Sequence, residues 1–300
     1  MRRAAVLPVL VACVLSACSG SAQGPQVPRA AARPLRVMSI NLCADQLVLA
    51  LLPRDRIASV TWMAHDPDGS LMAPAAAGVP ENHGFAEDVA RQRPDLVIAG
   101  RFAAPATRAL LKKLGYPLLE IDEASSFDDI RRVTREVAHA VGEEARGEAL
   151  ITRMDGQLAE LARDRAPPLR VVAWDGAGFG AGKGSLYDTL LGAAGAVNVA
   201  DDQPVGGLGR PDVEILLRTA PTLLVKGAGM GEAPGLRRNI ERHALVRRYW
   251  DGARTITIRQ AAYVCGTPMV AGAALELRDK LRAAAARVHE PLPFAQENAL

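Results

Sequence analysis

A glycine-rich segment at residues 175–185, with the sequence DGAGFGAGKGS, is the first candidate for chemistry in this chain. Loops of this composition can surround phosphate groups with backbone N–H donors. The nucleoside-triphosphate pattern requires a glycine at 177 and a serine or threonine at 184, where the chain has Ala177 and Gly184, and the dinucleotide pattern matches only weakly. We therefore predict a loop that brings backbone close to a ligand, with Phe179 as its apolar contact.

The histidines and the candidate nucleophiles of this sequence indicate neither a metal site nor a catalytic site. The chain has 5 histidines, and none forms an HxH or HxxxH pair, the kind of cluster that metal sites need. His65 follows a predicted strand at 57–62 and could face a cleft, although a surface position is commoner for a loop histidine. A Gly-x-Ser-x-Gly elbow is also absent from the sequence, so it offers no support for a hydrolase of that kind. We predict that the protein is not an enzyme and holds no metal or cofactor of its own.

Aromatic residues are scarce, at 4% of the chain, and five of them follow predicted strands: Trp62, Phe102, Trp174, Phe179 and Tyr263. In parallel α/β sheets, ligands bind at the carboxyl ends of the strands. Core packing could explain Trp62 and Trp174, but it does not explain Phe102 or Phe179, which lie in polar or glycine-rich loops. We predict a ligand site that includes Trp62, Phe102, Phe179 and Tyr263.

Charged residues beside these aromatics suggest the character of the ligand. Arg101 precedes Phe102 and could meet an anionic ligand, as could Lys183 or Lys226 from the second half of the chain. The formal net charge is only +3, with 36 basic and 33 acidic residues mixed along the chain. Because no dense basic run occurs, nucleic acid is not an expected partner.

The elements that must position these residues form an internal repeat. Short apolar runs, typical of buried strands, recur in two halves at nearly constant spacing. The pairs are 35–40 with 169–174, 95–100 with 222–227, and 117–122 with 254–259. In both halves the second strand follows an acid, a short helix and a proline, from Glu87 to Pro94 and from Glu214 to Pro221. Strands that alternate with helices predict an α/β fold of two lobes, each with a parallel sheet flanked by helices.

A long helical stretch at residues 126–165 lies between the halves. Ser126 can cap its N-terminus, Gly142 interrupts it, and residues 143–163 carry an apolar stripe at helical spacing. We predict one long, rigid helix that joins an N-terminal lobe (35–125) to a C-terminal lobe (166–290), with a tail at 291–300.

The N-terminus indicates export. Met1-Arg2-Arg3 precedes an apolar run from Ala4 to Leu15, which is typical of a secretory signal and too short to span a bilayer. The sequence before Cys18 resembles a lipobox, so we predict a signal peptide at 1–17, lipidation of Cys18 and a flexible tether at 18–34. The alternative is an ordinary signal that is cut near Ala22. The protein would then lie in the periplasm or on the outer face of the cell membrane, with the lipid anchor as its only membrane contact.

Together these features resemble the substrate-binding proteins of ABC importers for ferric siderophores, haem and cobalamin. The segments that carry the resemblance are RVMSINLCADQLVLAL, AEDVARQRPDLVIAG, DVEILLRTAPTLLVKG and YVCGTP, together with the helical stretch between them. The resemblance implies two α/β lobes joined by one long helix, with the ligand between lobes that move little.

The resemblance also implies partners. It predicts an iron–siderophore or cobalamin-type ligand and delivery to an ABC permease, with Glu87 and Glu214 docking onto permease arginines. The alternatives are a haem-binding transport protein, or a zinc or manganese binder, which would need histidine and carboxylate clusters that the sequence lacks. We expect the protein to be a monomer.

Two cysteines remain after Cys13 leaves with the signal and Cys18 is lipidated. Cys43 and Cys265 both follow strands, and a pair in an oxidising compartment favours a disulfide. Two free thiols that line the pocket are the alternative, since a sequence does not determine the distance between them.

Overall fold

Two parallel β-sheets organise the chain in the computed structural model, which describes residues 33–174, 181–200, 213–228, 243–250, 252–288 and 290–295. The predicted signal peptide, Cys18 and Phe179 lie outside the described residues. Trp174 belongs to a described strand, but its side chain is not among those described.

The first sheet has five strands in the order β3-β2-β1-β4-β5, and every pair is parallel. The strands are β1 (Val37–Ser39), β2 (Ile57–Thr61), β3 (Glu81–Asn82), β4 (Leu96–Gly100) and β5 (Leu118–Ile121). Side chains alternate between its two faces, so that Val37 and Ile98 join one core cluster while Met38 and Val97 join another. Both faces are therefore buried, as is usual for a parallel sheet.

The second sheet has the order β7-β6-β8-β9 and is also parallel. Its strands are β6 (Arg170–Trp174), β7 (Val197–Asn198), β8 (Leu223–Ala228) and β9 (Thr255–Arg259). Val171 packs in one core cluster and Val172 in another, on opposite faces of β6. The fold class predicted from the sequence is confirmed. The short edge strands β3 and β7 had not been predicted, and β2 ends at Thr61 because Trp62 begins a 3-10 turn.

Helices and 3-10 turns connect the strands, as parallel pairing requires. Those in the first half are α1 (Leu42–Leu51), η1 (Arg54–Arg56), η2 (Trp62–His65), α2 (Ala73–Ala76), α3 (Ala86–Gln92) and α4 (Pro105–Lys113). Those in the second half are α7 (Leu186–Ala194), α8 (Val213–Thr219), α10 (Ala244–Trp250), η4 (Gly252–Arg254), η5 (Gln260–Ala262) and α11 (Val270–Ala285).

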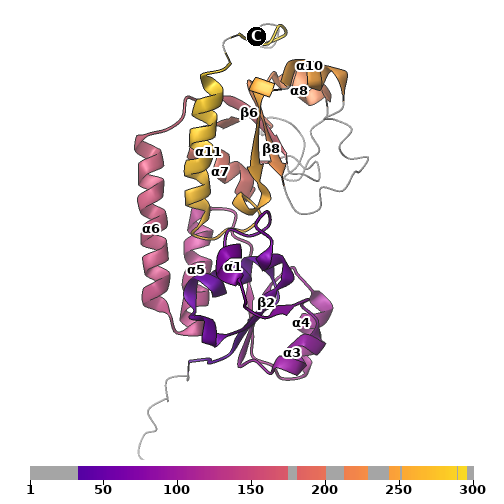
Figure 1. The fold of residues 1–300 in the computed structure, drawn as a ribbon, viewed down its shortest axis with the longest axis vertical. Helices are drawn as coiled ribbons and strands as arrows, with labels where there is room; N and C mark the ends of the chain where they lie inside the picture. The colour runs from indigo at the N-terminus through magenta and orange to yellow at the C-terminus, as the bar shows by residue number, and fades with distance from the viewer. Residues whose placement is uncertain are drawn as a thin grey trace, which may run out of the picture. The chain divides into compact units, whose positions relative to one another are not determined.

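The stretch between the halves is a pair of helices, α5 (Phe127–Val141) and α6 (Glu144–Arg163), rather than one helix over 126–165. Ser126 caps α5 as predicted, and Gly142 ends it in a left-handed conformation that favours glycine. Figure 1 shows α6 running beside α5 and then beside α11, and these helices contact one another. The long connecting helix is therefore α6 alone, because the chain reverses at Gly142.

Several contacts join the two halves. Leu186, Val270 and Ala271 come from the second half, yet they belong to the core cluster of the first sheet. The N–H of Ala261 donates to the carbonyl of Asp68 at 2.7 Å, and the hydroxyl of Thr189 donates to the carbonyl of Ser125 at 2.7 Å. The halves are thus held by shared apolar packing and by hydrogen bonds to backbone carbonyls.

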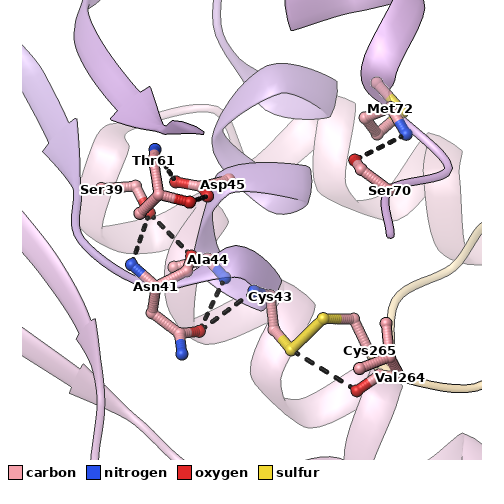
Figure 2. The surroundings of a disulfide bond; sticks show 10 residues. All are labelled: Ser39, Asn41, Cys43, Ala44, Asp45, Thr61, Ser70, Met72, Val264 and Cys265. Atoms are coloured by element: carbon pink, nitrogen blue, oxygen red, sulfur yellow. Dashed lines mark hydrogen bonds between the residues drawn. A yellow bond between two sulfur atoms is a disulfide. The ribbon is translucent and has the colours of Figure 1, made fainter. Parts of the chain in front are cut away.

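Asp45 is a fully buried carboxyl group on α1 (Figure 2). It accepts hydrogen bonds from the N–H of Thr61 at 3.1 Å and from the Thr61 hydroxyl at 2.5 Å. Burial raises the pKa of Asp45 to about 6, although hydrogen bonds from Ser39 and Thr61 oppose the rise. The folded protein therefore holds a proton on Asp45 at mildly acidic pH, where the unfolded chain has already released it.

We expect Asp45→Asn to remove one component of the pH dependence of stability. The stabilisation that the neutral Asp45 carboxyl confers is fully present below the ordinary pKa of 3.8 and is lost as the pH rises through about 6. Asparagine stays neutral and can still accept from the N–H of Thr61. The free energy of unfolding of the variant minus that of the wild type should rise by about 2–3 kcal/mol between pH 4 and pH 7.

Urea unfolding at several pH values checks this result. Other carboxyl groups have a lowered pKa and affect the pH dependence of stability with the opposite sign. One of them is Asp164, whose pKa is lowered chiefly by a hydrogen bond from Arg282. Only the difference between variant and wild type therefore isolates the contribution of Asp45. A difference that is constant across the pH range would contradict this account of Asp45.

Candidate functional site

A cavity of about 580 Å³ lies between residues of the first half and residues of the second half. Its first-half lining comes from the start of α1 and from the turns that follow β4 and β5. Its second-half lining comes from the start of α7 and from the segment before α11. The described lining residues are Asn41, Cys43, Leu47, Gly100, Arg101, Phe102, Ala103, Ile121, Asp122, Glu123, Ala124, Ser125, Val133, Lys183, Gly184, Ser185, Leu186, Tyr263, Val264 and Gly266.

The turn after β1 forms part of the first wall. The side chain of Asn41 accepts hydrogen bonds from the N–H groups of Cys43 and Ala44, at 3.0 and 3.2 Å, and so caps α1. Gly100, at the end of β4, lies against this side chain, because a Cβ atom there would be 2.9 Å from Asn41 Nδ2. Because glycine has no Cβ atom, the end of β4 can approach the capped start of α1, and both segments line the cavity.

Arg101 and Phe102 extend the same wall. Phe102 is 74% exposed, so its ring is free to contact a ligand in the cavity that it lines. Arg101 donates through Nε to Asp122, which also lies 3.5 Å from Arg132. This wall thus offers an aromatic ring and a guanidinium group whose charge is partly compensated by a neighbouring carboxylate.

The opposite wall contains a stacked pair of tyrosines. The rings of Tyr187 and Tyr263 are parallel within 8°, with centroids 4.1 Å apart. The Tyr187 hydroxyl donates to the carbonyl of Val225 at 3.2 Å, which ties the pair to β8. Tyr263 lines the cavity, while Lys183 is exposed at its rim, just before α7. The second wall therefore presents a fixed aromatic surface and a cation.

A disulfide between Cys43 and Cys265 closes one part of the lining (Figure 2). The two Cα atoms are 5.0 Å apart, within the range that a disulfide can bridge. Cys43 Sγ lies 3.8 Å from the carbonyl oxygen of Val264, which is a packing contact because a bridged sulfur carries no proton. The bond joins the start of α1 in one half to the segment before α11 in the other.

Comparison with known proteins decides the family. The sequence model described as "Periplasmic binding protein" matches residues 37–248. This chain belongs to the periplasmic binding protein family. The family is extracytoplasmic, and its members bind a small ligand and work with an ABC permease, so the chain is a transport protein rather than an enzyme.

Solved structures show the same fold. The haem-binding protein RhuT from Roseiflexus sp. RS-1 has 23% sequence identity, over 83% of this chain and 98% of its own, with a TM-score of 0.69. The haem-binding protein HutB of Vibrio cholerae has 18% identity, over 82% and 98%, with a TM-score of 0.69. The vitamin B12 binding protein BtuF of Vibrio cholerae has 17% identity, over 84% and 98%, with a TM-score of 0.63. No curated protein sequence matches the chain.

The cavity of this binding protein brings together Arg101, Phe102 and Tyr263 from the predicted ligand site, and also Lys183, one of the two lysines that the sequence offered as a further cation. Trp62 is 46% exposed and does not line the cavity, because β1 separates β2 from β4 in the sheet. Lys226 lies within β8 and does not line the cavity either. Phe179 is outside the described residues.

Sequence reasoning missed several polar lining residues, chiefly Asn41, Asp122, Ser125 and Ser185. Asn41 lies two residues after β1 and Asp122 directly follows β5, so the strand-end rule that drew attention to the aromatic residues could have found them. Within the described ranges, no three His, Cys, Asp or Glu side chains are grouped so that they could hold a metal ion. A helix long and apolar enough to cross a membrane is likewise not found in the part of the chain that the structure describes.

Glu87 and Glu214 occupy equivalent places in the two halves of the binding protein. Glu87 is exposed in the first turn of α3, which leads into β4, and Glu214 is exposed in the first turn of α8, which leads into β8. β4 lies between β1 and β5, just as β8 lies between β6 and β9. The two carboxylates are therefore related by the internal repeat.

Proposed function

We propose that this binding protein captures an iron–siderophore or cobalamin-type ligand in the cavity and delivers it to an ABC permease. The observation that carries this proposal is the cavity itself, with the exposed ring of Phe102 on one wall and Tyr263 on the other. Arg101 and Lys183 add cationic groups for an oxygen-rich ligand. BtuF binds vitamin B12, which supports a large ring ligand held between aromatic side chains.

Haem is the second candidate, because RhuT and HutB share the fold and bind haem. A zinc or manganese ligand has less support, since the described residues offer no cluster of metal-binding side chains. All candidate ligands absorb light or carry a metal. The absorption spectrum and metal content of the protein as purified therefore give a first discrimination.

A thermal-shift screen against haem, cobalamin and several ferric siderophores tests the proposal. A ligand at 100 times its dissociation constant should stabilise the protein by about 2.7 kcal/mol. A shift with cobalamin or a ferric siderophore, absent with free zinc and manganese, supports the proposed function, whereas a shift with haem alone favours the second candidate. A stabilising shift with zinc or manganese alone would overturn it.

For export, we propose cleavage before Cys18 and lipidation of its side chain, which leaves a monomer on a flexible tether. Mass spectrometry of the mature N-terminal peptide tests the modification. Cys18→Ser should release the protein from the membrane fraction. An N-terminus near Ala22 would favour the ordinary signal instead.

We expect Phe102→Ala to weaken binding of the ligand identified by the screen by about 1–3 kcal/mol, since the variant loses a buried aromatic contact. Phe179→Ala should act in the same way if its loop reaches the ligand. Leu114→Ala removes another exposed apolar side chain, at the far end of α4, and should leave affinity unchanged. Isothermal titration measures all three variants, and wild-type affinity in both phenylalanine variants would refute this pocket.

We expect charge reversal at Glu87 and Glu214 to impair transport without affecting ligand capture. Glu87→Arg and Glu214→Arg place a positive charge where permease arginines would dock, and like charges that meet at an interface cost several kcal/mol. Transport by the reconstituted permease should slow, while ligand affinity stays intact. Asp128→Arg, at the exposed first turn of α5, serves as the control. Normal transport with the double variant would contradict the docking role.

A further inference from the structure

The turn that presents Arg101 and Phe102 has a backbone that its own sequence does not favour. It spans residues 101–104, between β4 and α4, and is closed by a 3.1 Å hydrogen bond from the N–H of Ala103 to the carbonyl of Gly100. Ala104 adopts a left-handed conformation with φ of 44°, and α4 lacks a side-chain cap. Because such a conformation is unfavourable for alanine, contacts from outside the turn must stabilise it.

Arg108, on α4, supplies those contacts. Its Nε donates to the carbonyl of Ala103 at 2.7 Å, and its Nη1 donates to Glu120 on β5. Glu120 also accepts from Lys112 Nζ at 2.5 Å. The side chains of Arg108 and Glu120 are only 15% and 17% exposed. Hydrogen bonds from Lys112 and Arg108 lower the pKa of Glu120, so its carboxylate stays charged against Arg108 at neutral pH.

The same strand orients Arg101 itself. Asp122 follows β5 two residues after Glu120, and alternate residues of an extended chain point to the same side. Asp122 accepts from Arg101 Nε, while Glu120 accepts from Arg108, which holds the turn. Glu120 therefore acts on the backbone of the 101–104 turn through Arg108, and Asp122 acts on the side chain of Arg101. Packing cannot hold Phe102, because most of its ring is exposed.

We propose that Arg108 and Glu120 are positioning residues, which hold the 101–104 turn so that Arg101 and Phe102 face the cavity before a ligand arrives. Their role in ligand recognition rests on the proposed function, whereas their effect on the turn does not. A turn that is already ordered avoids the loss of conformational entropy that a mobile turn would suffer on binding. Neither residue lines the cavity, so each acts through the turn.

Hydrogen exchange of the ligand-free protein tests the effect on the turn. Arg108→Gln should speed exchange of the Ala103 amide by at least about tenfold, with exchange in β1 and β2 unchanged. Glu120→Gln, which keeps an acceptor for Arg108, should give a smaller increase. Arg135→Gln is the matched control, because it removes an arginine–glutamate pair between α5 and α6 and should leave the turn unchanged.

Titration with haemin, cyanocobalamin and a ferric hydroxamate siderophore tests the consequence for recognition. Whichever probe binds the wild type should bind Arg108→Gln about 3- to 10-fold more weakly, while Arg135→Gln binds normally. Wild-type exchange of Ala103 in Arg108→Gln would overturn the proposal, as would unchanged affinity despite a loosened turn. If none of the probes binds the wild type but exchange changes as expected, the proposed function is contradicted, while stabilisation of the 101–104 turn by Arg108 is supported.

Discussion

Cys43→Ser combined with Cys265→Ser should lower the free energy of unfolding by about 2–5 kcal/mol. The disulfide joins residues that are 222 positions apart, and loop-entropy theory assigns about 5 kcal/mol to the closure of so long a loop in the unfolded chain. Because the bond links the start of α1 to the segment before α11, its loss also removes the covalent link between the two halves at the cavity. Urea unfolding of the oxidised wild type and of the double variant measures the difference.

Two controls accompany this measurement. Reduced wild-type protein should unfold like the double variant, since both lack the covalent link. Before reduction, the denatured mature protein should show no titratable thiol at Cys43 or Cys265, and mass spectrometry should find the two peptides linked. Two reactive thiols would show that the bridge does not form in the mature protein.

Gly266→Ala is expected to destabilise the protein by about 2–3 kcal/mol, as overpacking of a tight contact does. A Cβ atom at this position would lie 2.0 Å from the carbonyl oxygen of Ala124 and 2.8 Å from its Cβ. Both atoms belong to the first half of the chain, whereas Gly266 belongs to the second half and follows the disulfide-bonded Cys265. A backbone carbonyl cannot move out of the way by changing rotamer, as a long side chain could. The variant must therefore separate the 124 and 266 segments, both of which line the cavity.

Gly156→Ala is the matched control and should have the opposite sign. Gly156 is exposed on α6, and a Cβ atom added there would have no neighbouring atom within 4 Å, so alanine should stabilise the helix by about 0.5–1 kcal/mol. Urea unfolding of both variants at one pH compares the two effects. Wild-type stability in Gly266→Ala would show that the contact with Ala124 is loose enough to admit a methyl group.

The amino-acid sequence alone determined the two α/β lobes, the main strands and the equivalence of Glu87 with Glu214. These features follow from local sequence patterns, which do not depend on where the segments lie in the folded protein. Apolar β-branched runs specify buried strands, while Ser126 and Gly142 specify where α5 begins and ends. The sequence also favoured a disulfide between Cys43 and Cys265. They are the two cysteines that remain after Cys13 and Cys18 are assigned to export, and an exported protein meets an oxidising compartment.

Only the tertiary structure decided which of these segments meet. The strand order places the ends of β1, β4 and β5 at the cavity and leaves Trp62, beyond β2, outside its lining. It also pairs Arg101 with Asp122 and brings Gly266 against Ala124. Such contacts depend on distances between residues remote in sequence, which no local pattern contains. Arg108 is the clearest example, since its contacts with Ala103 and with Glu120 on β5 exist only in the folded protein.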